Sequence, residues 1–144
     1  MDQEPTLTQG IFLSDSVIRE EGTGKLSLIG TFQTFNALKF PFASPPFIVT
    51  VSLSNLRGKL EQLRISVRIE EAASGHVAAS NTAVIGSKVD VTQNDIFEIP
   101  IPILPAAFPT AGLYHVVVLV NNENIGRRNL MVRSVTAGPT TENT

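Results

Sequence analysis

Strict alternation of apolar and polar side chains marks the middle of this chain of 144 residues. From Phe47 to Ser54 every second residue is a large apolar one, and residues 62–69 repeat the pattern with Arg64 and Arg68 at polar positions. Because successive side chains of a β-strand point to opposite faces, both segments predict strands with one dry face and one wetter face. The dry faces are expected to hold Phe47, Val49, Val51, Leu53, Leu63, Ile65, Val67 and Ile69.

Turn residues divide the remainder into further strand candidates, and no segment shows a helical period of useful length. The candidates are residues 11–18, 26–35, 77–85, 96–103, 113–120 and 129–135, and short helical turns could occupy 57–62 or 105–110. About eight strands without helices predict an all-β, immunoglobulin-like antiparallel sandwich of two sheets, with about 7–8 strands. The sandwich is expected over residues 10–135, between flexible polar arms over residues 1–9 and 136–144.

Two of the predicted strands have unusual compositions. Residues 96–103 contain Pro100 and Pro102, which cannot donate to a sheet ladder, so this segment must be an edge strand or an extended connection. Residues 113–120 are apolar on both faces, which indicates either a central strand covered on both sides or a face that meets a partner. The second face makes the strand a candidate interface through Leu113, His115, Val117 and Leu119.

The entry to that strand, Pro109-x-x-Gly112-x-Tyr114, is common late in immunoglobulin-like sandwiches. After the strand, residues 121–124 provide turn chemistry, because Asn tolerates left-handed backbone angles. The segment from 108 to 132 is therefore predicted to be an antiparallel hairpin.

Composition narrows the possible partners and compartments. The formal net charge is −2 and the basic residues are scattered, so we expect no nucleic-acid partner and no membrane-surface partner. Absence of Cys excludes disulfides, Cys-based zinc sites and Cys nucleophiles, and absence of Trp excludes an antibody-type core. The acidic start with Asp2 and Glu4 does not resemble a signal peptide, and no apolar stretch approaches the roughly 20 residues of a membrane helix. We expect a protein that is cytoplasmic or assembled intracellularly.

Several segments resemble binding motifs but lack residues or spacing that such sites require. The Gly22-Thr23-Gly24-Lys25 run lacks the Ser or Thr that follows Lys in a phosphate-binding loop, so a hairpin turn is favoured. His76 and His115 are the only histidines, and no spacing places a third ligand beside them. Asp90, Asp95 and Glu98 lack the dense spacing of a calcium loop. We expect no metal and no cofactor.

Asp15 is the most notable acidic residue, because it lies within a predicted strand. It could pair with Arg19 or Lys25 across the first hairpin, which is the structural interpretation. A pocket that held Asp15 with His115 or another acid would favour a carboxylate-dependent hydrolase instead.

The loop over residues 38–46 carries Phe40 and Phe42 among three prolines. Two interpretations stay open. The loop could plug one end of the sandwich, or it could present a rigid apolar contact surface to a partner, since prolines lower the entropy lost on binding.

The order of these motifs resembles a bacterial family of uncharacterised small β-sandwich domains. The matching motifs are Asp15, Gly24-Lys25, Leu28-Ile29-Gly30-Thr31-Phe32, Phe40-Pro41 and the Pro109 to Tyr114 entry. The resemblance covers most of residues 11–133. It implies a β-sandwich without an assigned activity and transfers no site residues.

Three functions follow as hypotheses. The first is a non-catalytic structural or interaction protein, a self-assembling or particle-associated subunit whose partners are copies of itself or other protein subunits. The second is a module that binds a peptide or small ligand through the edge at 99–103 or through Phe40 and Phe42. The third is the hydrolase around Asp15.

Overall fold

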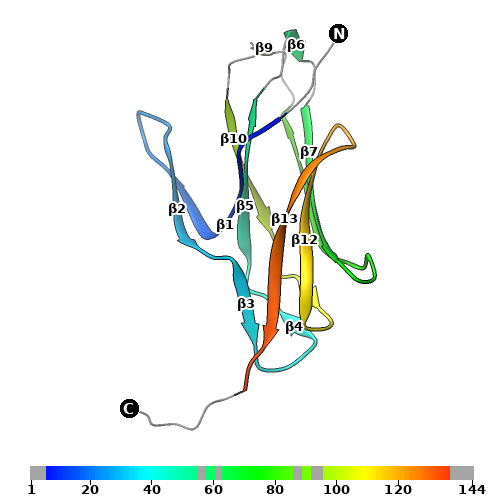
Figure 1. The fold of residues 1–144 in the computed structure, drawn as a ribbon. Coiled ribbons are helices and arrows are strands. Elements are labelled where there is room, and N and C mark those ends of the chain that lie inside the picture. Colours follow the sequence, from blue (N-terminus) through cyan, green and yellow to red (C-terminus); the bar gives the residue numbers. More distant parts are fainter. Residues whose placement is uncertain (1–5, 55–57, 61–62, 86–88, 92–95, 137–144) are drawn as a thin grey trace.

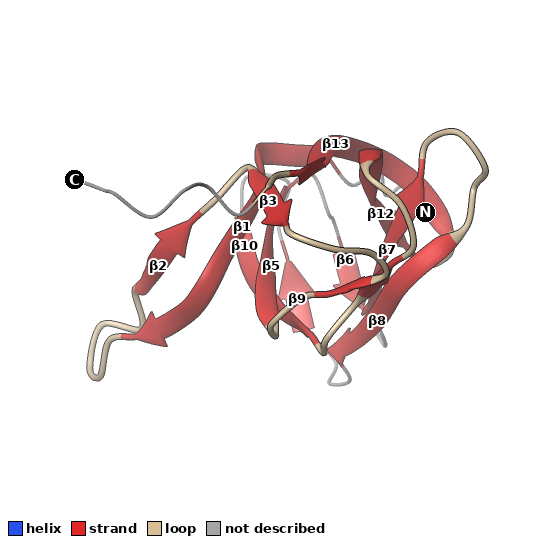
Figure 2. Cartoon of the chain, turned by 90° about the horizontal axis from the view of Figure 1, so that it is seen from below, coloured by secondary structure: helices blue, strands red, loops and turns tan. Residues whose placement is uncertain are grey.

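The computed structural model describes residues 6–54, 58–60, 63–85, 89–91 and 96–136, and shows two β-sheets packed face to face. The strand axes of the two sheets are roughly aligned in Figure 1. Figure 2 looks along these axes, so that the two layers are seen edge-on. Within the described residues no helix is present, and the helical turn expected over 105–110 is replaced by a short strand at 107–108. The turn expected over 57–62 lies partly outside the described residues. The all-β, immunoglobulin-like sandwich predicted from the sequence is confirmed.

The first sheet contains four strands that pair antiparallel. Their spatial order is β10 (Phe97–Ile103), β5 (Phe47–Ser54), β1 (Thr6–Arg19) and β2 (Leu26–Thr31). β10 occupies an edge, as its prolines require. β1 begins within the segment expected to be an arm, because Thr6 and Leu7 already pair with β5. The remainder of that arm, residues 1–5, and residues 137–144 of the other arm lie outside the described residues.

The second sheet contains five strands in the order β3 (Thr34–Ala37), β13 (Glu123–Ser134), β12 (Gly112–Val120), β7 (Leu63–Glu71) and β8 (Val77–Ile85). The chain therefore changes sheets between β2 and β3, where one continuous strand over 26–35 was expected. β3 also runs parallel to β13, which departs from the expected purely antiparallel pairing. The crossover between the sheets is the reason, since it brings β3 to the edge in the same direction as the last strand.

The four-stranded and five-stranded sheets together exceed the expected 7–8 strands, and four short strands complete the described chain. β4 (Phe42–Ala43) pairs with β11 (Ala107–Phe108), and β6 (Gly58–Leu60) pairs with β9 (Val89–Val91). Both pairs connect loops at the ends of the sandwich. The eight longer segments expected from the pattern correspond to the strands of the two main sheets.

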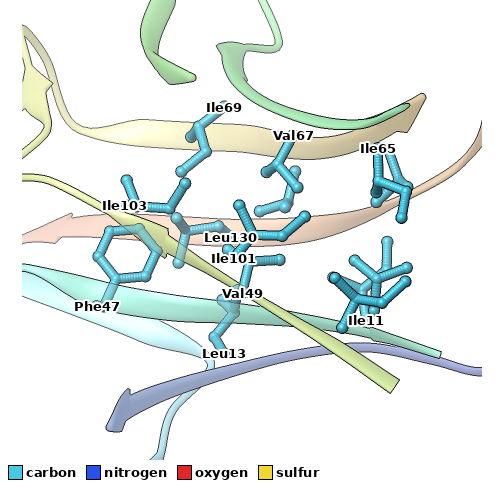
Figure 3. Close-up of a cluster of buried hydrophobic side chains, with 14 of the residues drawn as sticks. Ile11, Leu13, Phe47, Val49, Ile65, Val67, Ile69, Ile101, Ile103 and Leu130 are labelled. Atoms are coloured by element: carbon cyan, nitrogen blue, oxygen red, sulfur yellow. The ribbon is translucent and has the colours of Figure 1, made fainter. Parts of the chain in front are cut away.

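The core lies between the two sheets and is built from the predicted apolar faces (Figure 3). Every second residue of β5 and β7 is buried there, with exposures of 2% or less. Burial of each such side chain stabilises the fold by about 1.5–3 kcal/mol. β12 contributes Tyr114, Val116, Val118 and Val120 from its inner face, and is a central strand as its composition requires.

Aromatic side chains fill one end of this core. Phe35 contacts Phe32, Phe42, Phe47 and Phe108 with ring centroids 4.8–5.7 Å apart. The connection between β2 and β3 supplies Phe32, which turns inward instead of continuing the strand. The change of sheet is thus associated with burial of an aromatic side chain.

The entry to β12 is fixed by hydrogen bonds from Tyr114. Its hydroxyl donates to the carbonyl of Thr110 at 2.7 Å, which is the tyrosine corner of immunoglobulin-like sandwiches. The Thr110 hydroxyl in turn donates to the Glu71 carboxylate, and the Ser74 hydroxyl donates to the same group. The corner before β12 is therefore joined to the turn between β7 and β8.

One lateral opening of the sandwich is closed by contacts to the free edge of β1. Arg128 of β13 donates to the Ile11 carbonyl at 2.8 Å, and the backbone N–H of Phe32 donates to the Leu13 carbonyl at 3.1 Å. The Arg128 guanidinium also contacts Gln33. Burial lowers the pKa of Arg128 below its ordinary value, but an arginine stays charged at neutral pH. The opposite side is closed where Asn81 of β8 donates to the Pro102 carbonyl of β10 at 2.7 Å.

We expect Tyr114→Phe to lower the free energy of unfolding by about 1 kcal/mol, because the ring stays packed and only the hydroxyl donor is lost. Urea unfolding with an unchanged m-value measures this loss. Thr82→Val removes an exposed hydroxyl bond to Ser66 and serves as the control, within about 0.5 kcal/mol of the parent. Equal effects of the two substitutions would contradict a stabilising role for the corner.

We expect Arg128→Met to cost about 1–2 kcal/mol, because the Ile11 carbonyl loses a charged donor while the aliphatic stem is retained. The matched control is Arg127→Met on the preceding residue of β13, which is exposed and whose Nη1 lies 3.4 Å from His115 Nδ1. Denaturant unfolding of both variants compares the two arginines. A control as destabilised as Arg128→Met would show that the contact to β1 is not the cause.

The hydrogen bonds from Ser74 and Thr110 hold the pKa of Glu71 below its ordinary value of 4.5, outweighing burial, with a smaller contribution from His76. A lowered pKa stabilises the fold fully above the ordinary value, and the contribution is lost as the pH falls through the lowered one. Glu71→Gln should therefore lower Tm slightly at pH 7 and converge with the parent toward pH 3. Thermal scans across this range test it, with Glu123→Gln as control, and a pH-independent difference would refute the linkage.

Candidate functional site

The two phenylalanines expected to contact a partner lie against the protein's own core. Phe40 and Phe42 are half-buried and pack on the buried cluster, and the ring of Phe42 stacks on Phe108 at 6.0 Å. The neighbouring Leu38 stays 66% exposed beside a shallow depression. This packing favours the end-plug interpretation of the loop, and its role as a contact surface stays a prediction.

The second expected interface lies on the outer face of the five-stranded sheet. Leu113, His115 and Leu119 of β12 are half-buried there. Val117 is only 4% exposed, because Arg68 and Arg127 are its cross-strand neighbours on either side. Long arginine stems cover apolar surface while their charged ends reach water. Much of the excess apolar surface of β12 is therefore covered by the chain itself, and an interface at these residues stays a prediction.

The structure does not bring Asp15 and His115 together. Asp15 is exposed on β1, where its side chain lies over Gly30 of β2, whereas His115 is on the outer face of the other sheet. Among the described residues the ion pair that forms is Arg68 with Glu70 at 2.9 Å, so the expected pairs of Asp15 with Arg19 or Lys25 are not formed. The arrangement required for the carboxylate hydrolase is absent from this part of the chain.

The other sequence motifs lie in turns or on the surface. The Gly22 to Lys25 run is the tip of the hairpin between β1 and β2, closed by the bond from the Glu20 N–H to the Lys25 carbonyl. His76 is exposed in the turn before β8. Asp90 lies in β9 with its side chain outside the described set, and Asp95 lies outside the described residues. No cluster of metal-binding side chains occurs among the residues that the structure describes. The described residues form no helix that is long and apolar enough to cross a membrane.

The β1–β2 hairpin lies at a sharp angle to the rest of the four-stranded sheet (Figures 1 and 2), which the sequence does not predict. The first half of β1 pairs with β5, whereas its second half pairs with β2, with Ser14 at the point of exchange. The chain turns sharply back there, so the hairpin forms one arm of a V whose other arm is the sheet (Figures 1 and 2). Gly30 opposite this bend has φ +69°, and a Cβ added there would lie 2.4 Å from Asp15 Oδ2. Glycine is required by both the backbone angle and the contact.

A groove of about 240 Å³ lies between the hairpin and the outer face of the four-stranded sheet. We call it the hairpin groove. Four strands contribute its lining, which consists of Phe12, Leu26, Leu28, Thr50, Ser52 and Glu98. Thr50 and Ser52 were expected on the wetter face of β5, yet they are 3% and 1% exposed. The hairpin that turns back over this face is the reason for the difference.

The polar groups of the groove are not satisfied by the protein. The hydroxyls of Thr50 and Ser52 have no hydrogen-bond partner among the described residues, which is uncommon for buried side-chain oxygens. Glu98 lies directly across from Ser52 in the register of β10 with β5, and its side chain is exposed. Phe12 of β1 lies across from Thr50. One end of the groove is therefore polar and acidic, and the other is aromatic.

Alternation alone could not have identified this groove. The pattern from Phe47 to Ser54 places Thr50 and Ser52 on the second face of β5, but only the bend at Ser14 covers that face. The one local signal is Gly30 within an otherwise regular strand pattern, since an isolated glycine often marks a bulge or a close approach of two chains.

Solved structures with similar folds are distant. A glycoside hydrolase family 2 member from Bacteroides cellulosilyticus matches with a TM-score of 0.44 and 17% identity, over 62% of this chain and 13% of that one. An immunoglobulin-like protein from Pseudomonas aeruginosa matches with a TM-score of 0.36 and 14% identity, over 90% of this chain and 97% of that one. The chain thus spans about an eighth of the hydrolase chain, and no function passes to it from either protein.

Among curated protein sequences none matches this chain. Residues 9–133 match a family of unknown function designated DUF6941, in agreement with the uncharacterised family expected from the motifs. The match runs from the first strand to the last. The protein therefore belongs to this family of unknown function, DUF6941, and has an immunoglobulin-like β-sandwich fold.

Proposed function

We propose that the protein is a non-catalytic interaction subunit that associates with a second copy of itself through strand β2. The observation that carries the proposal is the contrast between the two edges of the four-stranded sheet. An exposed strand edge presents unpaired N–H and C=O groups, and proteins usually protect it with proline, charge or a covering segment.

The β10 edge has such protection. Pro100 and Pro102 remove donors from the strand, and Asn81 of the other sheet caps the Pro102 carbonyl. The β2 edge does not. Among the described strands β2 pairs only with β1, and its sequence from Leu26 to Thr31 contains no proline and no charged residue. An edge of this composition is suited to pairing with another strand.

Exposed apolar side chains accompany the free edge. Ile18 is 55% and Ile29 is 44% exposed. In the register of the hairpin Ser16 lies opposite Ile29 and Ile18 lies opposite Ser27, so the two isoleucines share one face. Burial of this face against a partner adds an apolar contact to the backbone pairing.

A second copy is the partner that this edge fits. Two β2 edges related by a two-fold axis would pair antiparallel, each supplying the same residues to the other. Such an isologous contact joins the two four-stranded sheets into one. Assembly of these pairs into a larger particle is the finer form of the proposal.

The position of Asp15 supports a non-catalytic role. Its carboxylate is exposed on the hairpin and does not share a pocket with His115. The surfaces of the hairpin therefore offer a better basis for a function than the acidic residue does.

The test is native mass spectrometry and light scattering of the full chain at micromolar concentrations. We expect the parent to be a dimer, and Ile18→Glu/Ile29→Glu to shift it to monomer with at least a tenfold weaker dimerisation constant. Val84→Glu is the matched control, because Val84 is 46% exposed on the β8 edge of the other sheet. Circular dichroism establishes that both variants are folded.

A parent that remains monomeric at these concentrations would overturn the proposal. Dissociation by Val84→Glu, with the hairpin variant unaffected, would place the interface on the five-stranded sheet instead. Neither result depends on whether the hairpin groove binds a ligand.

A further inference from the structure

We propose that the hairpin groove binds an unbranched alkylammonium group, with its charged end at Glu98 and Ser52 and its alkyl chain along Leu26, Leu28 and Phe12. The groove combines two buried hydroxyls without partners, one carboxylate and three apolar side chains. This site is separate from the β2 edge, and its test does not depend on dimerisation.

The first step of the argument concerns the missing hydrogen bonds. Buried hydroxyls nearly always find a partner, because a hydroxyl taken from water without one destabilises the folded state. Two such groups, on Thr50 and Ser52, occur side by side on the same face of β5. Both lie at a groove, so a bound molecule can supply what the protein does not.

The second step concerns charge. Of the described residues that line the groove, Glu98 is the charged one. An ionised carboxylate only accepts hydrogen bonds, and hydroxyl oxygens can accept them as well. A group that carries donors alone and a positive charge satisfies both the Glu98 carboxylate and the hydroxyl of its cross-strand neighbour Ser52, and an ammonium group has that character. An anionic ligand would be repelled by Glu98.

The third step concerns the shape of the polar region. Glu98 and Ser52 are cross-strand neighbours. Thr50 lies two residues before Ser52 on β5, directly across from Phe12 of β1. Two residues of a strand cover about 7 Å, so the acidic end and the aromatic end are separated by roughly that distance. A stem of about four carbons, as in the lysine side chain, spans such a length and contacts apolar walls. The groove volume of about 240 Å³ limits the ligand to a slender group of this kind.

The test is an NMR titration of the ¹⁵N-labelled full chain with n-butylammonium chloride, with n-butanol and sodium butyrate as the uncharged and anionic analogues. We expect saturable shifts for the backbone amides of Thr50, Ser52 and Glu98 with the ammonium ion. The affinities for the two analogues should be at least tenfold weaker. Equal shifts with n-butanol, or no saturable shifts with any compound, would overturn the proposal.

Variants test where the ammonium ion binds, and a lysine analogue tests whether the natural ligand is a lysine side chain or a free amine. Glu98→Gln and Ser52→Ala should each weaken n-butylammonium binding by at least tenfold, and Glu123→Gln, an exposed acid on β13, should leave it unchanged. A parent-like affinity in both groove variants would refute the assignment. Tighter binding of Nα-acetyl-lysine N-methylamide than of n-butylammonium would identify the source as a lysine of a partner protein, and weaker binding would identify a free amine.

Discussion

The backbone groups of strand β1 impose the main constraint on this fold. A strand inside a sheet needs partners on both edges, but β2 pairs only with the second half of β1. The free edge of the first half must therefore be satisfied otherwise, since buried carbonyls without donors are costly. Phe32 supplies its N–H to Leu13, and Arg128 supplies its guanidinium to Ile11. These two bonds close the side of the sandwich that the hairpin leaves open. The change of strand partner along β1 is therefore the cause of both the angled hairpin and the closing bonds.

Sequence patterns predict the core of this protein well because its signal is local. Phe47 to Ser54 and the strand from Leu63 onward bury the residues that period-2 alternation assigns to the inside, and Pro100 and Pro102 correctly place β10 at an edge. The sequence pattern could not predict that β1 pairs with β5 in its first half and with β2 in its second half. This arrangement depends on contacts between strands that are distant in the sequence. The same event divides the expected strand 26–35 between two sheets. It also explains the groove, since Thr50 and Ser52 lie on a polar face that only a distant hairpin covers.

The hairpin gives the protein two chemically different surfaces from one short element. Its free edge offers backbone groups and the exposed side chains of Ile18 and Ile29, whereas its other side contributes Leu26 and Leu28 to a groove with an acidic end. The sandwich beneath provides a rigid support, as loops and hairpins on rigid scaffolds commonly carry function. Gly30 is the residue on which both surfaces depend, because it permits the close approach to Asp15 at the bend.

The parallel pairing of β3 with β13 has a consequence for how the chain folds during synthesis. β3 ends at Ala37 and its strand partner among the described residues begins at Glu123, so about ninety residues separate the two halves of this pair. At typical rates of translation, roughly ten seconds pass before β13 can follow β3 out of the ribosome. During that interval β3 lacks its pairing strand, although the aromatic neighbours of Phe35 at positions 42, 47 and 108 precede β13 in the sequence. The aromatic contacts of Phe35 can therefore form before β3 gains its strand partner, and the edge of the five-stranded sheet is completed only when the last strand emerges.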